Sequence, residues 1–115
     1  MIEQPERRSY PRRRLASMSC PVNERVLYEC PAGKLAIVEH VVFCSTHTGS
    51  ETFRLHHVRQ DEATSVHNAL FYDYSLSAKS YLSEDGIYYL TQGERLVCSS
   101  PNASRITITI YGQEV

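Results

Sequence analysis

Hydrophobic positions in this chain recur every second residue in short runs, which is the spacing of β-strands rather than of helices. The run at residues 104–111 is the most regular, because Ile106, Ile108 and Ile110 share one face and polar or aromatic residues occupy the other. Val, Ile, Thr and Tyr are plentiful, and these residue types suit a pleated, half-buried surface. The pattern therefore predicts an all-β protein.

Eight such runs follow one another, separated by Gly, Pro, Ser and Asn, which favour turns. We expect strands at residues 22–29, 35–44, 51–58, 69–76, 79–82, 87–90, 94–98 and 104–111. About eight short strands predict a single β-sandwich or jelly roll.

The segments between these runs predict turns and one irregular loop. Residues 30–33 have Pro second and Gly fourth, which fits a type I turn. Residues 83–86 are expected to turn between two short strands. Residues 59–68 are polar and irregular, with at most one helical turn.

The run at residues 35–44 is apolar on both faces. Strict alternation places Val41 and Phe43 on one face, and Val38 and Val42 on the other. A strand with one face in water carries polar residues on that face, so we expect the second face to be covered within the monomer or by another subunit. We favour a subunit contact: a homotrimer whose interface includes part of Val38, Val42 or Phe43.

Tyrosine dominates the aromatic residues, with 8 Tyr, 3 Phe and no Trp. Its apolar ring and polar hydroxyl suit protein interfaces and sugar-binding platforms, although tyrosine is also common in strands for packing alone. The lack of Trp weakens the case for a carbohydrate-binding module. We therefore assign Tyr72 and Tyr74 to the core and the oligomer interface.

Residues 1–19 differ in composition from the rest. Five of the 12 basic residues lie here against two acidic ones, and Pro5 and Pro11 oppose a continuous helix. We expect an extended arm over residues 1–19 that is ordered by a partner, followed by a β-sandwich domain over residues 20–115; the alternative is a solvated tail. The partner-binding residues of this arm are expected to be Arg7, Arg8, Arg12, Arg13, Arg14, Leu15 and Met18.

Chain length and net charge further limit the size of the fold and the kinds of partner that we expect. A chain of 115 residues forms one small domain, and the net charge of -1 gives no reason to expect nucleic acid as the main partner. An arginine-rich arm can neutralise phosphates, but we favour an acidic protein surface for it. No apolar run reaches the roughly 20 residues of a membrane-spanning helix, and we expect neither a membrane partner nor a secretory signal.

The chemically active residue types form no known motif. His56 and His57 are adjacent on an expected strand and so point to opposite faces. No nucleophile elbow or phosphate-binding loop is present. The four cysteines contain no CxxC pair, and we expect reduced thiols; a Cys20–Cys30 bridge is geometrically possible, but connectivity cannot be read from spacing. We therefore expect no enzyme activity, no metal and no cofactor.

Several stretches resemble small structural proteins of tailed bacteriophages. Residues 26–34 read Val-Leu-Tyr-Glu-Cys-Pro-Ala-Gly-Lys, followed by an apolar strand and Cys-Ser-Thr at 44–46. Those proteins often read Leu-Tyr-x-x-Pro-Ala-Gly-Lys, an apolar strand and a Cys-Asn-Thr-like loop. Residues 68–73 and 86–96 are similar to the later strands of the same family. The likeness covers residues 22–115 and departs at Ser45, where Asn is frequent, and in the arginine-rich segment.

The resemblance implies a β-sandwich without catalytic residues that serves as a virion structural protein. The expected role is a capsid decoration (cement) protein that bridges neighbouring shell subunits. Its partners would be copies of itself and the major capsid protein or another virion protein. It would be made in the host cytoplasm and lie on the capsid surface. A neck, tail or fibre-associated component is the first alternative, and a carbohydrate-binding module is the second.

Overall fold

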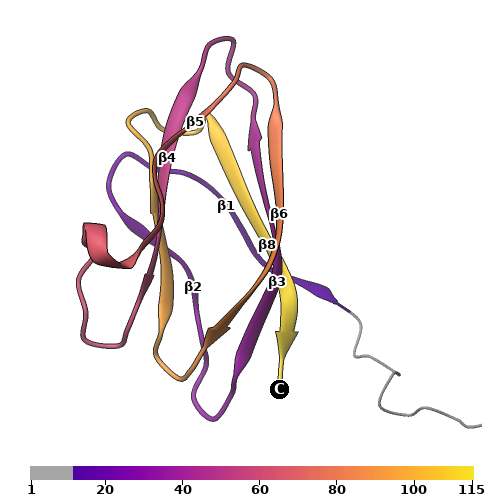
Figure 1. The fold of residues 1–115 in the computed structure, drawn as a ribbon, viewed down its shortest axis with the longest axis vertical. Coiled ribbons are helices and arrows are strands. Elements are labelled where there is room, and N and C mark those ends of the chain that lie inside the picture. Colours follow the sequence, from indigo (N-terminus) through magenta and orange to yellow (C-terminus); the bar gives the residue numbers. More distant parts are fainter. Residues whose placement is uncertain (1–11) are drawn as a thin grey trace, which may run out of the picture.

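Two four-stranded antiparallel sheets pack face to face in the computed structural model, which describes residues 12–115 (Figure 1). Sheet A has the strand order β1-β8-β3-β6, and sheet B has the order β2-β7-β4-β5. The strands are β1 (Arg13–Ser19), β2 (Arg25–Glu29), β3 (Ala36–Ser45), β4 (Glu51–Val58), β5 (Ala69–Leu76), β6 (Tyr81–Leu90), β7 (Arg95–Ser99) and β8 (Ile106–Glu114). The all-β sandwich predicted from the alternating pattern is confirmed.

The core lies between the sheets and is built from the inward-facing residues of each strand. Ile106, Ile108 and Ile110 of β8 are all fully buried, as their alternation predicts. Across the sandwich, the ring of Phe43 on β3 stacks on Phe53 of β4 with 4.3 Å between centroids. These contacts hold sheet A on sheet B, because apolar burial between two sheet faces is the main stabilising term in a sandwich.

A β-bulge at Glu39 corrects the prediction of a two-sided apolar strand. The pairing of β3 with β8 shifts register between Val38 and His40, so β3 carries one extra residue there. Strict alternation therefore fails along β3. The buried side chains are Ala36, Val38, Val41, Phe43 and Ser45; the others are Ile37, Glu39, His40, Val42 and Cys44.

This bulge also removes two residues from the expected oligomer interface. Val38 and Phe43 are both 0% exposed and belong to the core. A residue packed between the sheets cannot contact another subunit unless the fold opens, so their assignment to an interface is wrong. Val42 points away from the core and is half-buried, which keeps it available for a contact.

The N-terminal segment is shorter than expected, because its second half is a strand. Arg13–Ser19 form β1, which pairs with β8 at the edge of sheet A. Leu15 and Met18 are partly buried and pack against the core of their own chain. The predicted domain boundary at residue 19 is therefore wrong, because the sandwich already includes β1, which begins at Arg13. An arm can comprise only residues 1–11, which lie outside the described part of the chain.

Three local predictions can be compared with the structure. β6 runs unbroken through residues 83–86, so the expected turn is wrong and the two short strands are one. The turn after β2 lies one residue later than expected: the Lys34 N–H donates to the Pro31 carbonyl at 3.3 Å, and Gly33 has φ +75°. A 3-10 helix, η2 (Val66–Asn68), confirms the single helical turn.

Candidate functional site

Three strongly exposed apolar side chains lie along β6, the edge strand of sheet A. Tyr81, Ile87 and Tyr89 are 71%, 59% and 57% exposed. Odd-numbered residues of β6 point outward, because the even-numbered ones from Leu82 to Leu90 alternate with them and are more buried. The three side chains therefore share one face, turned away from the core.

The neighbouring strands continue this face. On β3, Cys44 pairs with Tyr81, and Ile37 pairs with Tyr89. Val42 lies between Ser83 of β6 and Thr109 of β8 in the middle of the sheet. We call this surface the outer face of sheet A. It comprises Ile37, His40, Val42 and Cys44 on β3, Tyr81, Ser83, Asp85, Ile87 and Tyr89 on β6, and Thr107, Thr109, Tyr111 and Gln113 on β8.

A hydrogen-bonded chain of three polar side chains crosses this face. His40 on β3 lies 2.6 Å from Asp85 Oδ1 through Nδ1 and 2.8 Å from Ser83 Oγ through Nε2. With the proton on Nδ1, the ring donates to Asp85 and accepts from the Ser83 hydroxyl. Only the antiparallel pairing of β3 with β6 brings these residues together, so their spacing in the sequence gives no signal of it.

The order Ser–His–Asp is that of a nucleophile, a base and an orienting acid. Such a relay acts on a substrate held against preorganised donors in a site that excludes water. Here the Asp85 side chain is 82% exposed, and all three groups lie on an open sheet surface. The two hydrogen bonds fix the His40 ring at the centre of the outer face.

The two tyrosines assigned to the oligomer interface lie on the other sheet. Tyr72 on β5 carries the guanidinium of Arg54 above its ring at 4.0 Å, which is a cation–π contact. Tyr74 packs against the rings of Phe53 and Phe71 at the edge of the core. Both are part of sheet B, so the structure does not bring them together with Val42.

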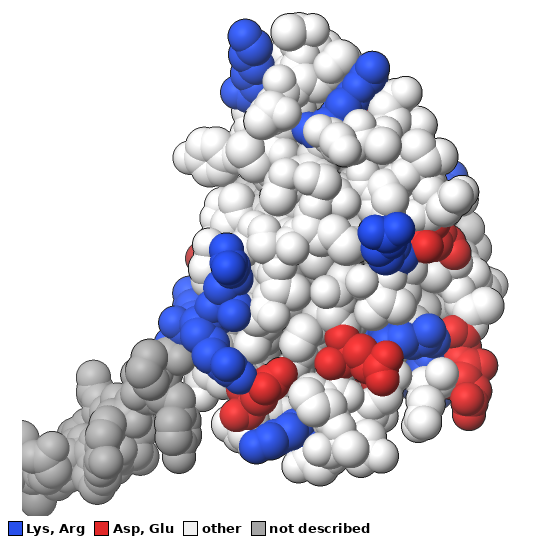
Figure 2. Space-filling model, turned by 180° about the vertical axis from the view of Figure 1, so that it is seen from behind, with Lys and Arg blue, Asp and Glu red and all other residues white. Residues whose placement is uncertain are grey.

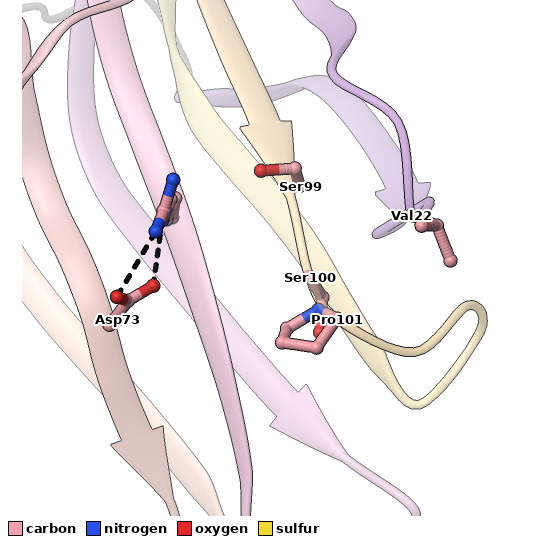
Figure 3. A pocket seen from close by; sticks show the side chains of 6 residues that line it. Val22, Asp73, Ser99, Ser100 and Pro101 are labelled. Atoms are coloured by element: carbon pink, nitrogen blue, oxygen red, sulfur yellow. Dashed lines mark hydrogen bonds and ion pairs between the residues drawn. The ribbon is translucent and has the colours of Figure 1, made fainter.

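A shallow hollow beside Arg54 is another feature that could hold a ligand (Figure 3). Arg54 binds both carboxylate oxygens of Asp73, at 2.7 and 3.1 Å, on one wall of the hollow. These hydrogen bonds hold the pKa of Asp73 below its ordinary value. Because the two charges satisfy each other, the hollow offers a ligand little charge. Its lining residues are Val22, Arg54, Asp73, Ser99, Ser100 and Pro101.

Of the three described arginines that were expected to bind a partner, Arg12 and Arg13 have side-chain contacts within their own chain. Arg12 bonds Glu39 at 3.1 Å, and Arg13 bonds Glu114 at 2.8 Å. Figure 2 shows a group of Lys and Arg side chains at the lower left of the described molecule, with acidic side chains close by. Arg14 is exposed on β1 and pairs with Tyr111 in register. Arg7 and Arg8 lie outside the described residues.

Among residues 12–115, no group of three or more His, Cys, Asp or Glu is placed to hold a metal ion. Over the same residues there is no helix long and apolar enough to cross a membrane. No protein-family model matches the chain, and comparison with curated proteins and with solved structures also finds no match.

Proposed function

We propose that this chain is a non-enzymatic structural protein of a tailed-phage virion, a capsid decoration protein that bridges neighbouring shell subunits. The observation that carries the proposal is the outer face of sheet A, where Tyr81, Ile87 and Tyr89 stand exposed beside half-buried Ile37 and Val42. Apolar side chains grouped on one face and bordered by polar groups are typical of protein–protein contacts. The resemblance to phage structural proteins supplies the class of partner.

Self-association through this face would give the homotrimer expected from the sequence. The partner of the trimer would be the major capsid protein or another virion protein. Residues 1–11 contain Arg7 and Arg8, whose planar guanidinium groups suit carboxylates of a neighbouring subunit. A small protein that holds several subunits at once gains from multivalency, because each further contact is intramolecular.

The oligomer tests the outer face directly. The triple variant Tyr81→Ser, Ile87→Ser, Tyr89→Ser removes the exposed apolar groups, and Val66→Ser on η2, whose side chain is 63% exposed, is the matched control. Sedimentation velocity should show a trimer for the wild type and the control, and a monomer for the triple variant. A wild-type monomer at high concentration would contradict self-association.

Copy number per particle tests the location. Quantitative mass spectrometry of purified virions should find hundreds of copies for a shell decoration protein. A handful or a dozen copies would instead support the neck, tail or fibre alternative. The exposed rings of Tyr81 and Tyr89 keep the carbohydrate-binding alternative open. Glycan-array binding that is lost in the triple variant would favour it.

A further inference from the structure

The two edge strands of sheet A carry opposite charges. β1 contains Arg13 and Arg14 and no acidic residue, whereas β6 contains Glu84 and Asp85 and no basic residue. Among residues 12–115, β1 pairs only with β8, and β6 pairs only with β3. Each edge strand therefore has one row of backbone N–H and C=O groups that no other described strand uses.

One charged side chain on each edge is open to a second molecule. Unlike Arg13, Arg14 has no ion pair within the described residues. It is exposed and pairs in register with Tyr111, so it lies on the side of the outer face of sheet A. Asp85 lies on the same side, is 82% exposed, and within the described residues bonds only through Oδ1, to His40. Its second carboxylate oxygen can accept from a guanidinium.

We propose that β1 of one copy adds to β6 of a second copy, so that sheet A continues from one molecule into the next. This inference rests on the proposed function, because it specifies the contact through which the copies associate. Neighbouring strands of sheet A are antiparallel throughout, so its two edge strands run in opposite directions. A copy rotated about an axis parallel to the strands therefore presents β1 antiparallel to β6, with both outer faces on the same side.

Charge disfavours the contacts in which an edge meets its own counterpart. Pairing β6 with β6 would bring two acidic strands together, and pairing β1 with β1 would bring the arginines together. Like charges on neighbouring strands are destabilising, whereas opposite charges are stabilising. The contact is therefore heterologous, and such contacts form closed rings when the rotation returns to the first copy. Because sheet B covers the inner face of each sheet A, a ring of three turns the outer faces toward its axis.

A single register satisfies both faces of the joined strands. It sets Arg14 of one copy opposite Asp85 of the next on the outer side. With Leu15 counted as the extra residue of the bulge in β1, the same register sets Met18 opposite Leu82 on the inner side. Met18 and Leu82 are both partly buried at the margin of their own core. Their contact would therefore extend the apolar core from one molecule to the next.

Directed cross-linking tests this register. It places Ser17 of one copy opposite Ser83 of the next, and both side chains are exposed. Opposed Cα atoms of antiparallel strands are about 4.5–5.5 Å apart, which a disulfide can span. Ser17→Cys and Ser83→Cys proteins, each in a Cys44→Ser background, are mixed and oxidised. We expect a linked dimer in the mixture and in neither protein alone, with position 17 joined to position 83 in non-reducing peptide maps.

The matched control for the register is Ser19→Cys mixed with Ser83→Cys. Ser19 is also exposed on β1 but lies two residues further along the strand. It should give several-fold less linked dimer than Ser17→Cys, because the two Cα atoms are then too far apart for unstrained geometry.

Charge reversal tests the contact without an added thiol. Arg14→Asp should raise the dissociation constant of the oligomer about tenfold, because it sets like charges opposite each other. Adding Asp85→Arg to this variant should restore association. Arg25→Asp, at an exposed position of the edge strand β2 in sheet B, is the matched control and should leave association unchanged. Sedimentation velocity over a range of concentrations measures all of these proteins.

The outcomes separate this inference from the proposed function. A wild-type oligomer whose mixture gives no link between positions 17 and 83 would overturn the edge contact and leave self-association standing. A linked oligomer that does not bind purified virions would support the edge contact and contradict the virion role. A wild-type monomer at high concentration would overturn both.

Discussion

Gly112 on β8 lies directly against the main chain of Ile37 on β3. A Cβ atom added at Gly112 would be 1.9 Å from the Ile37 carbonyl oxygen and 3.1 Å from the Cα of Val38. The approach occurs beside the bulge at Glu39, where β3 carries its extra residue against β8. Because the obstacle is backbone in the centre of sheet A, no side-chain rotation can relieve it.

Gly112→Ala should therefore destabilise the fold by about 2 kcal/mol or more, since β3 and β8 would have to separate locally. Urea unfolding followed by circular dichroism measures the change. Gly86→Ala is the control on the same sheet, because a Cβ there meets only the Tyr88 hydroxyl at 4.0 Å. Equal unfolding midpoints for the two variants would contradict the predicted clash.

Glu51 on β4 is buried and should make the stability depend on pH. Its carboxylate accepts from Asn102 at 3.0 Å and from Arg105 at 3.1 Å, both in the loop before β8. Burial alone would raise the pKa of Glu51, but these hydrogen bonds and one from the Thr52 N–H outweigh it and hold the pKa below the ordinary 4.5. The ionised form therefore stabilises the fold above the unfolded-state pKa, and this stabilisation is lost as the pH falls through the folded-state pKa.

Glu51→Gln should cost about 1–3 kcal/mol of unfolding free energy near neutral pH, because Asn102 and Arg105 lose their charged acceptor. The difference from the wild type should shrink as the pH falls through the folded-state pKa of Glu51, because the wild-type carboxylate then takes up a proton. Urea unfolding at a series of pH values from about 7 downward measures this change. Glu29→Gln, at an exposed position of β2, is the control. A difference that stays constant with pH would contradict the role of the Glu51 charge.

Val42 and Phe43 are neighbours in the chain but should give opposite mutational results. Phe43→Ala should destabilise the fold by about 3–5 kcal/mol, because it empties a position stacked on Phe53. Val42→Ser on the outer face of sheet A should leave unfolding nearly unchanged and weaken self-association. Unfolding curves and sedimentation velocity on both variants measure the stability and the association. A Phe43→Ala protein that loses association without losing stability would contradict the placement of Phe43 in the core.

Removal of residues 1–11 should leave the sandwich folded, because β1 begins at Arg13. The unfolding temperature of the truncated protein is expected to stay within a few degrees of the wild type. Its binding to purified virion particles is expected to fall. Binding of the full chain should also weaken as salt rises, since exposed charges are screened over about 8 Å at physiological ionic strength. Occupancy on purified particles at low and high salt measures both effects.

Arg12→Gln together with Arg13→Gln is the matched control for this truncation. These arginines pair with Glu39 and Glu114 of their own chain, and their side chains are 51% and 60% exposed. Such exposed pairs contribute at most about 1 kcal/mol to stability. We expect full occupancy from this double variant; equal occupancy of the truncated and full-length proteins at every salt concentration would leave the segment without a docking role.

The alternation of residues predicts the sandwich because strand periodicity is a local property. It succeeds at Ile106, Ile108 and Ile110, where β8 has one buried face throughout. It fails along β3, because a bulge depends on how the neighbouring strand pairs. β1 was missed because Leu15 and Met18 find their apolar contacts only on distant strands, while the charged residues beside them resemble those of a tail.

The candidate site was still harder to predict. The outer face of sheet A combines residues of β3, β6 and β8, and a sequence without known pairing does not show which strands are neighbours. His40, Ser83 and Asp85 illustrate this, because their contacts depend entirely on the register of β3 with β6.

The bulge at Glu39 determines which single-codon insertions and deletions β3 can accept without moving its core residues. Without this residue, β3 would alternate regularly and still bury Val38, Val41 and Phe43. Loss of one codon at position 39 therefore leaves the buried side chains of β3 buried and the outward-facing ones outward. A single-codon insertion or deletion between Val41 and Phe43 instead exchanges buried and outward-facing positions over part of the strand. The extra residue nevertheless has its own contacts: its carboxylate binds Arg12 and Gln113 at 3.1 and 3.0 Å. A homologue lacking that codon would keep the same core and lose the contact that holds Arg12 to the sandwich.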